Sequence, residues 1–193
     1  AVLFLGLPAQ KPVPASLYPG NKAPLVSQKY IPLPLGNIKP SGHLLHMLEL
    51  QRDGLTGNLD SIYKLVCGSD NGWLGGNGDC WERGPYWIDG LVPLAYILDD
   101  TKLKEKVQQW MDWSFENQRS DGYFGPYPNK EGTPKIAGTQ QTRSEDWWPK
   151  MVMLNAMQQY YSATGDERVI TLMTNYFKYQ LKTLSLIHIR RGY

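Results

Sequence analysis

Two short runs of the sequence place carboxylates beside tryptophans, and these runs hold the residue types that glycoside chemistry requires. The first run spans residues 72–89 and the second spans residues 144–149. Hydrolysis of a glycosidic bond needs one acid that protonates the leaving oxygen and a second group that attacks or that activates water. Indole and phenol rings pack well against the C–H faces of sugars. The two runs therefore predict a carbohydrate site with acidic residues.

The candidate site residues come from these runs and from one nearby loop. Four carboxylates are candidate catalytic groups: Glu82, Asp89, Glu145 and Asp146. Six side chains are candidate substrate contacts: Trp81, Arg83, Tyr86, Tyr123, Trp147 and Trp148. Asp89 follows Glu82 by seven residues, so two turns of one helix can present both acids toward a cleft.

Each acid also has a purely structural alternative. Glu145 and Asp146 can cap a helix, where negative charge interacts favourably with the N-terminal dipole. Glu82 and Arg83 can form an ordinary surface ion pair, which contributes little to stability. If this helix face points into the core instead, Asp89 needs a buried partner, and Arg83 is a candidate for that role.

Helices must position these residues, because apolar residues recur at helical spacing along most of the chain. The pattern predicts helices over about 41–54, 85–98, 100–115, 144–165 and 166–181, after an extended segment over 30–40. Glycine-rich loops are expected over 68–79 and 122–138. Pro93 suggests a kink or an early end in the second helix. Three tryptophans at helical spacing are expected in the core: Trp87, Trp110 and Trp113.

The four later helices pair into two hairpins, which align with each other at a spacing of 66 residues. The aligned pairs are Asp79 with Glu145, Trp81 with Trp147, Asp100 with Asp166, Leu103 with Val169, Trp110 with Tyr176 and Trp113 with Tyr179. Repeated hairpins with one long loop always at the same end are typical of an α/α toroid or solenoid. The sequence therefore predicts an all-α fold with its loops gathered on one face. Two unrelated hairpins of a bundle are the alternative.

Composition and charge exclude several classes of protein. The 193 residues are 41% hydrophobic and 20% charged, which is typical of a globular protein. A net charge of +2 without long runs of one sign predicts no nucleic-acid partner. Cys67 and Cys80 lack zinc-site spacing, and His43 and His46 lack a third ligand, so no metal or other cofactor is expected.

The two ends of the chain differ from its middle. Residues 1–24 combine an apolar start with small residues and prolines, which is typical of a signal-peptide remnant and a Pro-rich lead-in. Its seven-residue apolar start cannot span a membrane, where about 20 residues are needed. Residues 25–183 form the predicted helical domain, and residues 184–193 break the helical pattern and resemble a non-native tail. A short strand is the alternative at each end. We expect a secreted or periplasmic protein.

Five segments of the chain resemble one family of enzymes. They are Leu35–Leu45, Glu49–Leu55, Trp81–Leu91, Gln118–Tyr123 and Tyr160–Asp166, and the Trp-Glu-Arg-Gly-Pro-Tyr-Trp run is the most specific. Together they resemble the N-terminal half of the beta-L-arabinofuranosidase-like glycoside hydrolases. The resemblance implies a partial (α/α)6 toroid built of helical hairpins, a carbohydrate substrate, and a fragment whose partner is the missing C-terminal half of its own catalytic domain.

The sequence also departs from that family. Members active on arabinofuranosides carry His-Glu-Leu-Tyr where this chain has Glu145–Trp148. Their cysteine nucleophile and zinc-binding cysteines lie in the later half of the barrel, and Cys67 and Cys80 do not match them. We expect a glycosidase that releases sugar, with L-arabinofuranose as a candidate, from plant or bacterial glycans. The alternatives are a polysaccharide lyase or unsaturated-uronide hydrolase, using Tyr123 and Arg143 as base and cation, and a non-catalytic carbohydrate-binding module.

Overall fold

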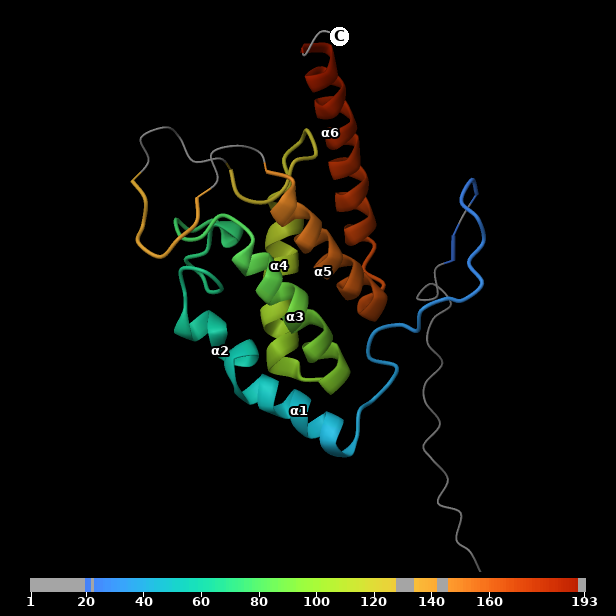
Figure 1. Cartoon of the computed structure of the whole chain (residues 1–193), viewed down its shortest axis with the longest axis vertical. Coiled ribbons are helices and arrows are strands. Elements are labelled where there is room, and N and C mark those ends of the chain that lie inside the picture. Colours follow the sequence, from blue (N-terminus) through green and yellow to red (C-terminus); the bar gives the residue numbers. More distant parts are fainter. Residues whose placement is uncertain (1–19, 22, 128–133, 142–145, 191–193) are drawn as a thin grey trace, which may run out of the picture.

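A computed structural model of the protein describes residues 20–21, 23–127, 134–141 and 146–190, and these residues form helices and loops without a strand (Figure 1). The helices are α1 (Gly42–Asp53), α2 (Leu55–Ile62), α3 (Arg83–Leu98), α4 (Thr101–Glu116), α5 (Trp148–Thr164) and α6 (Arg168–Arg190), with a short 3-10 turn, η2 (Gly72–Leu74). The all-α class is therefore confirmed, whereas closure into a toroid stays a prediction. None of the helices in these ranges is long and apolar enough to cross a membrane.

The two predicted hairpins are α3 with α4 and α5 with α6, and their turns correspond at the predicted spacing. Asp99 ends α3 in the left-handed conformation with φ 59°, and Gly165 ends α5 in the same way with φ 71°. In the first hairpin the Asp100 side chain accepts a hydrogen bond from the backbone N–H of Leu103 at 3.0 Å. Asp166 begins the second helix similarly, because it accepts from the N–H of Arg168 at 3.0 Å.

The core lies between the hairpins, and corresponding positions of the two hairpins share it. The buried pairs are Leu91 with Met157, Leu103 with Val169 and Trp110 with Tyr176. α3 packs against both α4 and α5, while α6 packs against α4 and α5 (Figure 1). This arrangement places α3 and α5 side by side and leaves one long side of each exposed. As predicted, Trp87 and Trp110 are buried, and their rings meet edge to face at 5.8 Å.

Pro93 does not end α3 early, and the structure shows how the helix tolerates it. Proline lacks the N–H that would bond to the carbonyl four residues earlier, which belongs to Asp89. The side-chain amide of Gln159, on α5, donates to this carbonyl at 3.5 Å instead. The expected early end is therefore wrong, since α3 continues to Leu98.

Three further elements differ from the prediction. α2 was not predicted, since its eight residues are few for a periodic pattern and include Gly57. The backbone of α6 stays helical through Arg190, so the predicted break in the helical pattern at Leu184 is wrong. Ser41 precedes α1 as expected, but its side chain makes no capping hydrogen bond.

Most of residues 1–24, where a signal-peptide remnant is predicted, lie outside the described residues.

Candidate functional site

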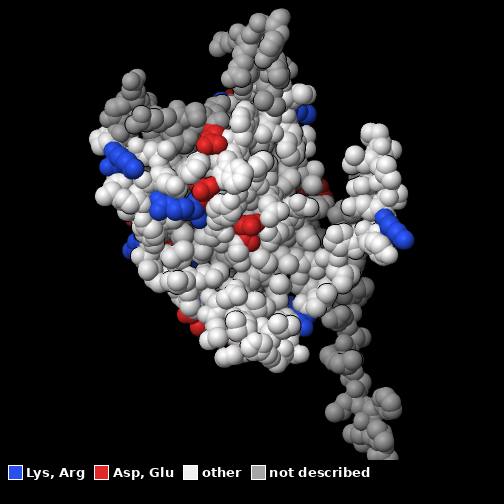
Figure 2. Space-filling view, viewed as in Figure 1, with Lys and Arg blue, Asp and Glu red and all other residues white. Residues whose placement is uncertain are grey.

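The exposed sides of α3 and α5 form one continuous surface, which we call the α3–α5 face. It carries six polar or aromatic side chains: Glu82, Tyr86, Asp89, Trp148, Asn155 and Gln159. Tyr86 is 48% exposed and Trp148 is 47% exposed, so both rings are available to a ligand. Figure 2 views the molecule from this side and shows acidic groups spaced along the region where α3 and α5 lie.

Two tryptophan–carboxylate hydrogen bonds join the starts of α3 and α5. The indole N–H of Trp81 donates to Asp146 Oδ2 at 2.6 Å. In the opposite direction, the indole N–H of Trp148 donates to Glu82 Oε2. Glu82 and Trp148 are 66 residues apart, so the bond joins corresponding positions of the two hairpins. The internal repeat thus brings the two sequence runs together at one end of the α3–α5 face.

The two acids of these bonds differ in how fully they are engaged. Asp146 uses both oxygens, because Oδ1 also accepts from the backbone N–H of Trp148 at 3.0 Å at the start of α5. Asp146 thus bonds a backbone N–H at the start of α5, although the residue at the N-cap of α5 is Trp147, whose side chain makes no capping hydrogen bond. Within the described part of the chain, Trp148 is the sole hydrogen-bond partner of the half-buried Glu82 side chain. Glu82 is consequently the better placed of the two to reach a ligand.

Asp89 lies on the same side of α3, two turns along from Glu82. Its Oδ1 accepts hydrogen bonds from the side-chain amides of Asn155 and Gln159, both at 2.7 Å. Arg83 was the expected partner if Asp89 pointed into the core, but α5 supplies both partners instead. Sequence analysis missed these amides, although the 66-residue alignment places Asn155 opposite Asp89 and could have identified it.

Arg83 pairs with Asp79 rather than with Glu82. Asp79 is fully buried, and it accepts from Arg83 Nε at 3.1 Å and also from Arg83 Nη2. The backbone N–H groups of Trp81 and Gln140 also donate to Asp79, at 3.2 and 2.7 Å. Arg83 Nη2 reaches the carbonyl of Gly138 at 2.8 Å. We call this cluster the Asp79 junction, since it ties residues 68–83 to residues 134–141.

The surroundings of Arg83 in the junction favour its charged form. Partial burial disfavours the charged guanidinium of Arg83, but the hydrogen bond and the charge of Asp79 outweigh burial and raise its pKa. Because Arg83 is occupied in this way, its predicted substrate contact would compete with a structural bond. The ion-pair alternative for Glu82 and Arg83 is wrong in its partner: the acid of the pair is Asp79.

Two other predicted substrate contacts lie away from the α3–α5 face. Tyr123 is 1% exposed, donates to the carbonyl of Pro126 at 2.7 Å and accepts from buried Lys150 at 2.9 Å. Trp147 packs on the core side, and the centroid of its ring lies 6.3 Å from the ring centroid of Tyr176. Glu145, the remaining catalytic candidate, lies outside the described residues.

The described residues contain no group of three or more His, Cys, Asp and Glu side chains that could hold a metal ion. Burial raises the pKa of the Cys67 thiol to about 12, with Asp60 and Asp79 adding to the shift. Burial likewise raises the pKa of Cys80. Metal binding and nucleophilic attack need the thiolate. Burial therefore keeps both thiols protonated, as is typical of structural rather than reactive cysteines.

Comparison with models of protein families supports the sequence resemblance. Residues 58–191, well over half of the chain, match the model described as beta-L-arabinofuranosidase, GH127 catalytic domain. The comparisons with curated proteins and with solved structures found no match. The match covers α3 to α6, the Asp79 junction and the α3–α5 face. The chain therefore belongs to the beta-L-arabinofuranosidase family of glycoside hydrolases, GH127.

Proposed function

We propose that the protein is a glycosidase that releases a terminal sugar, with L-arabinofuranose as the first candidate, from plant or bacterial glycans. The α3–α5 face is the wall of its substrate site, and a secreted or periplasmic location suits such substrates. The single observation that carries the proposal is Glu82: an accessible carboxylate, held by an indole from the next hairpin, beside the exposed ring of Tyr86. Family membership supplies the reaction class.

The side chains of the face divide the chemistry among them. Glu82 is the proposed catalytic acid or base, since an acid held by one hydrogen bond keeps an oxygen for substrate or water. Trp148 and Tyr86 present aromatic surface for a sugar ring. Asp89, oriented by two amides, is the second carboxylate of the face and is proposed to accept a hydrogen bond from a sugar hydroxyl.

The other enzyme class loses support from this arrangement. A polysaccharide lyase needs a base that reaches the sugar, and its candidate base Tyr123 is buried and bonded to Lys150. The cation proposed for that reaction, Arg143, lies outside the described residues. Among the described residues, no contact favours the lyase, so the glycosidase is the function proposed.

The test uses the full-length protein with a panel of nitrophenyl glycosides, including arabinofuranosides of both anomers, and with plant arabinans. We expect sugar release, and we expect Glu82→Gln to lower kcat by about 100-fold or more, the usual contribution of an acid–base group. Glu105→Gln is the matched control, because Glu105 is exposed and lies on α4, which contributes no side chain to the face.

Three outcomes of this test would contradict the role of Glu82, the glycosidase proposal or the specificity of the assay. A folded Glu82→Gln variant with wild-type kcat would remove Glu82 from the catalytic machinery. Binding of arabinan without any hydrolysis would overturn the glycosidase proposal in favour of a carbohydrate-binding module. Loss of activity in Glu105→Gln as well would show that the assay responds to charge in general rather than to the site.

A further inference from the structure

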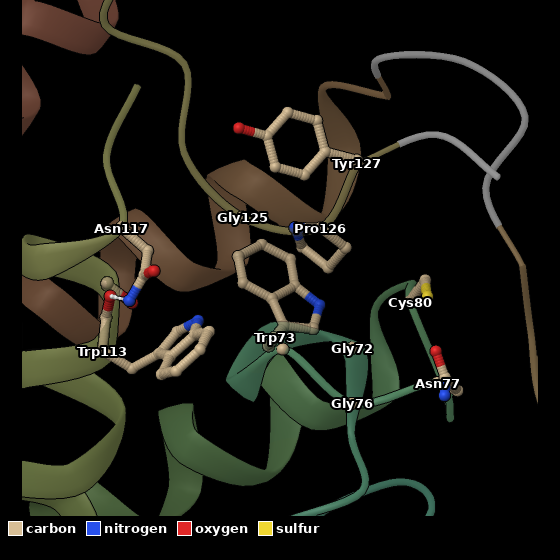
Figure 3. A pocket seen from close by; sticks show the side chains of 12 residues that line it. Gly72, Trp73, Gly76, Asn77, Cys80, Trp113, Asn117, Gly125, Pro126 and Tyr127 are labelled. Carbon is tan, nitrogen blue, oxygen red and sulfur yellow. Dashed lines mark hydrogen bonds between the residues drawn. The ribbon is translucent and has the colours of Figure 1, made fainter. Parts of the chain in front are cut away.

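A cavity of about 260 Å³ lies apart from the α3–α5 face, and the catalytic proposal does not use it. It opens between the η2 turn, the C-terminal end of α4 and the segment Gly125–Tyr127 (Figure 3). We call it the η2–α4 cavity. Sequence analysis placed one of its walls, Trp113, in the core, yet this ring lines the cavity.

Glycines build the aromatic walls of the cavity by letting backbone approach ring edges. A Cβ at Gly75, where φ is +80°, would lie 2.4 Å from the ring of Trp113. A Cβ at Gly125, where φ is +87°, would lie 2.7 Å from the ring of Trp73. Only glycine satisfies both the positive φ and the close approach at these positions. The walls are therefore fixed in shape, with no side chain from either glycine to fill the space.

The rim of the cavity is polar and exposed. Asn77 and Asn117 contribute amides, and Tyr127, which is 62% exposed, contributes a phenol ring on the opposite side (Figure 3). Amide groups can both donate and accept hydrogen bonds, as sugar hydroxyls can. Ring, amide and backbone groups thus meet around a space that is open to solvent.

Charge separates this cavity from other hollows of the molecule. Among the described residues that line it, none carries a charged side chain. By contrast, the hollow between α1, α2 and α4 is lined by Arg52, Asp53 and Lys106 among others. An uncharged aromatic cavity with amides at its rim favours a neutral, hydroxyl-rich ligand over an anion or a cation.

The cavity also connects to the α3–α5 face through one chain of hydrogen bonds. Trp73, which forms the buried wall, donates its indole N–H to the carbonyl of Trp81 at 2.7 Å. Trp81 in turn donates to Asp146 at the end of the face. The cavity wall and the face therefore share a fixed structural element.

From these observations we propose that the η2–α4 cavity binds a neutral sugar unit of the glycan, a unit other than the one cleaved at the α3–α5 face. The inference rests on the proposed function for the class of ligand, a glycan, but not for the chemistry of Glu82. Its effect is to hold longer substrates or polymers without taking part in bond cleavage.

The experiment compares Tyr127→Ala and Asn77→Ala with the control Tyr30→Ala in the full-length protein. Tyr30 is also highly exposed but does not line the cavity. Affinity for arabino-oligosaccharides is measured by calorimetry, together with KM for the same oligosaccharides and kcat/KM for a nitrophenyl monoglycoside. Because all three side chains are exposed, the variants should keep the wild-type melting temperature.

We expect each cavity variant to bind oligosaccharides about fivefold more weakly and to raise the KM for them by about fivefold, as loss of one ring or amide contact does. The kcat/KM for the monoglycoside should stay unchanged. Unchanged oligosaccharide affinity in both variants would overturn the proposal. Equal losses for both substrates would also overturn it, since the cavity would then belong to the catalytic site. If no glycoside is hydrolysed but oligosaccharides still bind and the cavity variants lose binding, this proposal stands while the proposed function fails.

Discussion

Asp79 and Glu82 lie three residues apart in one sequence run, yet the structure gives them opposite environments. Asp79, in the Asp79 junction, is fully buried and accepts hydrogen bonds from Arg83 and from two backbone N–H groups. Glu82, on the α3–α5 face, is partly exposed and bonds to Trp148. The number of donors around a carboxylate and its burial thus separate an acid that holds loops together from one that can meet a ligand.

The largest expected effect on stability comes from breaking the junction. Asp79→Asn removes the negative charge beside Arg83, so we expect the free energy of unfolding to fall by about 3 kcal/mol, typical of a disrupted buried ion pair. The measurement is urea denaturation followed by circular dichroism. Asp53→Asn, in the exposed Arg52–Asp53 pair, is the matched control and should change stability by less than about 0.5 kcal/mol.

Glu82→Gln completes this first comparison. Because Glu82 makes one contact at the surface, its replacement should leave the free energy of unfolding within about 0.5 kcal/mol of the wild type. A loss as large as that of Asp79→Asn would show that both acids are structural and would remove the contrast between the two regions.

The next largest effect on stability is expected at alkaline pH and comes from Cys67. The pKa of Cys67 rises from an ordinary 9.0 to about 12 in the folded protein, chiefly through burial. Above pH 9.0 the unfolded thiol ionises while the folded thiol keeps its proton, so stability present below this pH is lost as pH rises toward about 12. The slope attributable to Cys67 is at most about 1.4 kcal/mol per pH unit.

Denaturation at several pH values between 9 and 10 measures this effect, before most tyrosines ionise. Cys67→Ala should be less stable at neutral pH because of the cavity left behind, but its stability should fall less steeply with pH. Equal slopes in the variant and the wild type would contradict the assignment of the alkaline loss to this thiol.

A smaller effect is expected on the face when the support of Glu82 is removed. Trp148→Phe keeps an aromatic ring but deletes the indole N–H that bonds to Glu82. We expect kcat/KM to fall about fivefold, the value of one hydrogen bond, with unfolding unchanged. If the loss equals that of Glu82→Gln, the indole N–H is essential for Glu82 to act and does more than orient it.

The smallest effect concerns Asp89, which has two amide partners. Asn155→Ala leaves Gln159 in place, so we expect a loss of stability of about 0.5 kcal/mol or less. The double variant Asn155→Ala/Gln159→Ala should lose more than the sum of the single variants, because Asp89 then has neither amide donor. Additive losses would show that the two amides act independently.

The helices and their repeat were predictable because they depend on local pattern. The sequence alone identifies turn residues such as Gly165, the apolar spacing and the 66-residue alignment, and the structure confirms them. The roles of the acids were not predictable in the same way. Asp79 and Glu82 have similar sequence surroundings, and their difference arises from contacts with Gln140 and Trp148, some 60 residues away.

The η2–α4 cavity escaped prediction for a related reason. Trp113 follows the spacing of a core helix position, and nothing local shows that the backbone of Gly75 will cover one edge of its ring and leave a hollow beside it. Likewise, the carbonyl of Asp89 that Pro93 leaves without its helical donor meets the amide of Gln159 from another helix. Side-chain surroundings of this kind require the packing of distant segments, which single-residue patterns do not encode.

The corresponding turns at Asp99 and Gly165 suggest a substitution for protein engineering. Both residues adopt the left-handed conformation, which glycine adopts more readily than aspartate. The second hairpin therefore already holds the residue that consensus design would choose for the first. Asp99→Gly would exchange the surface contact with Lys104 for a relaxed backbone.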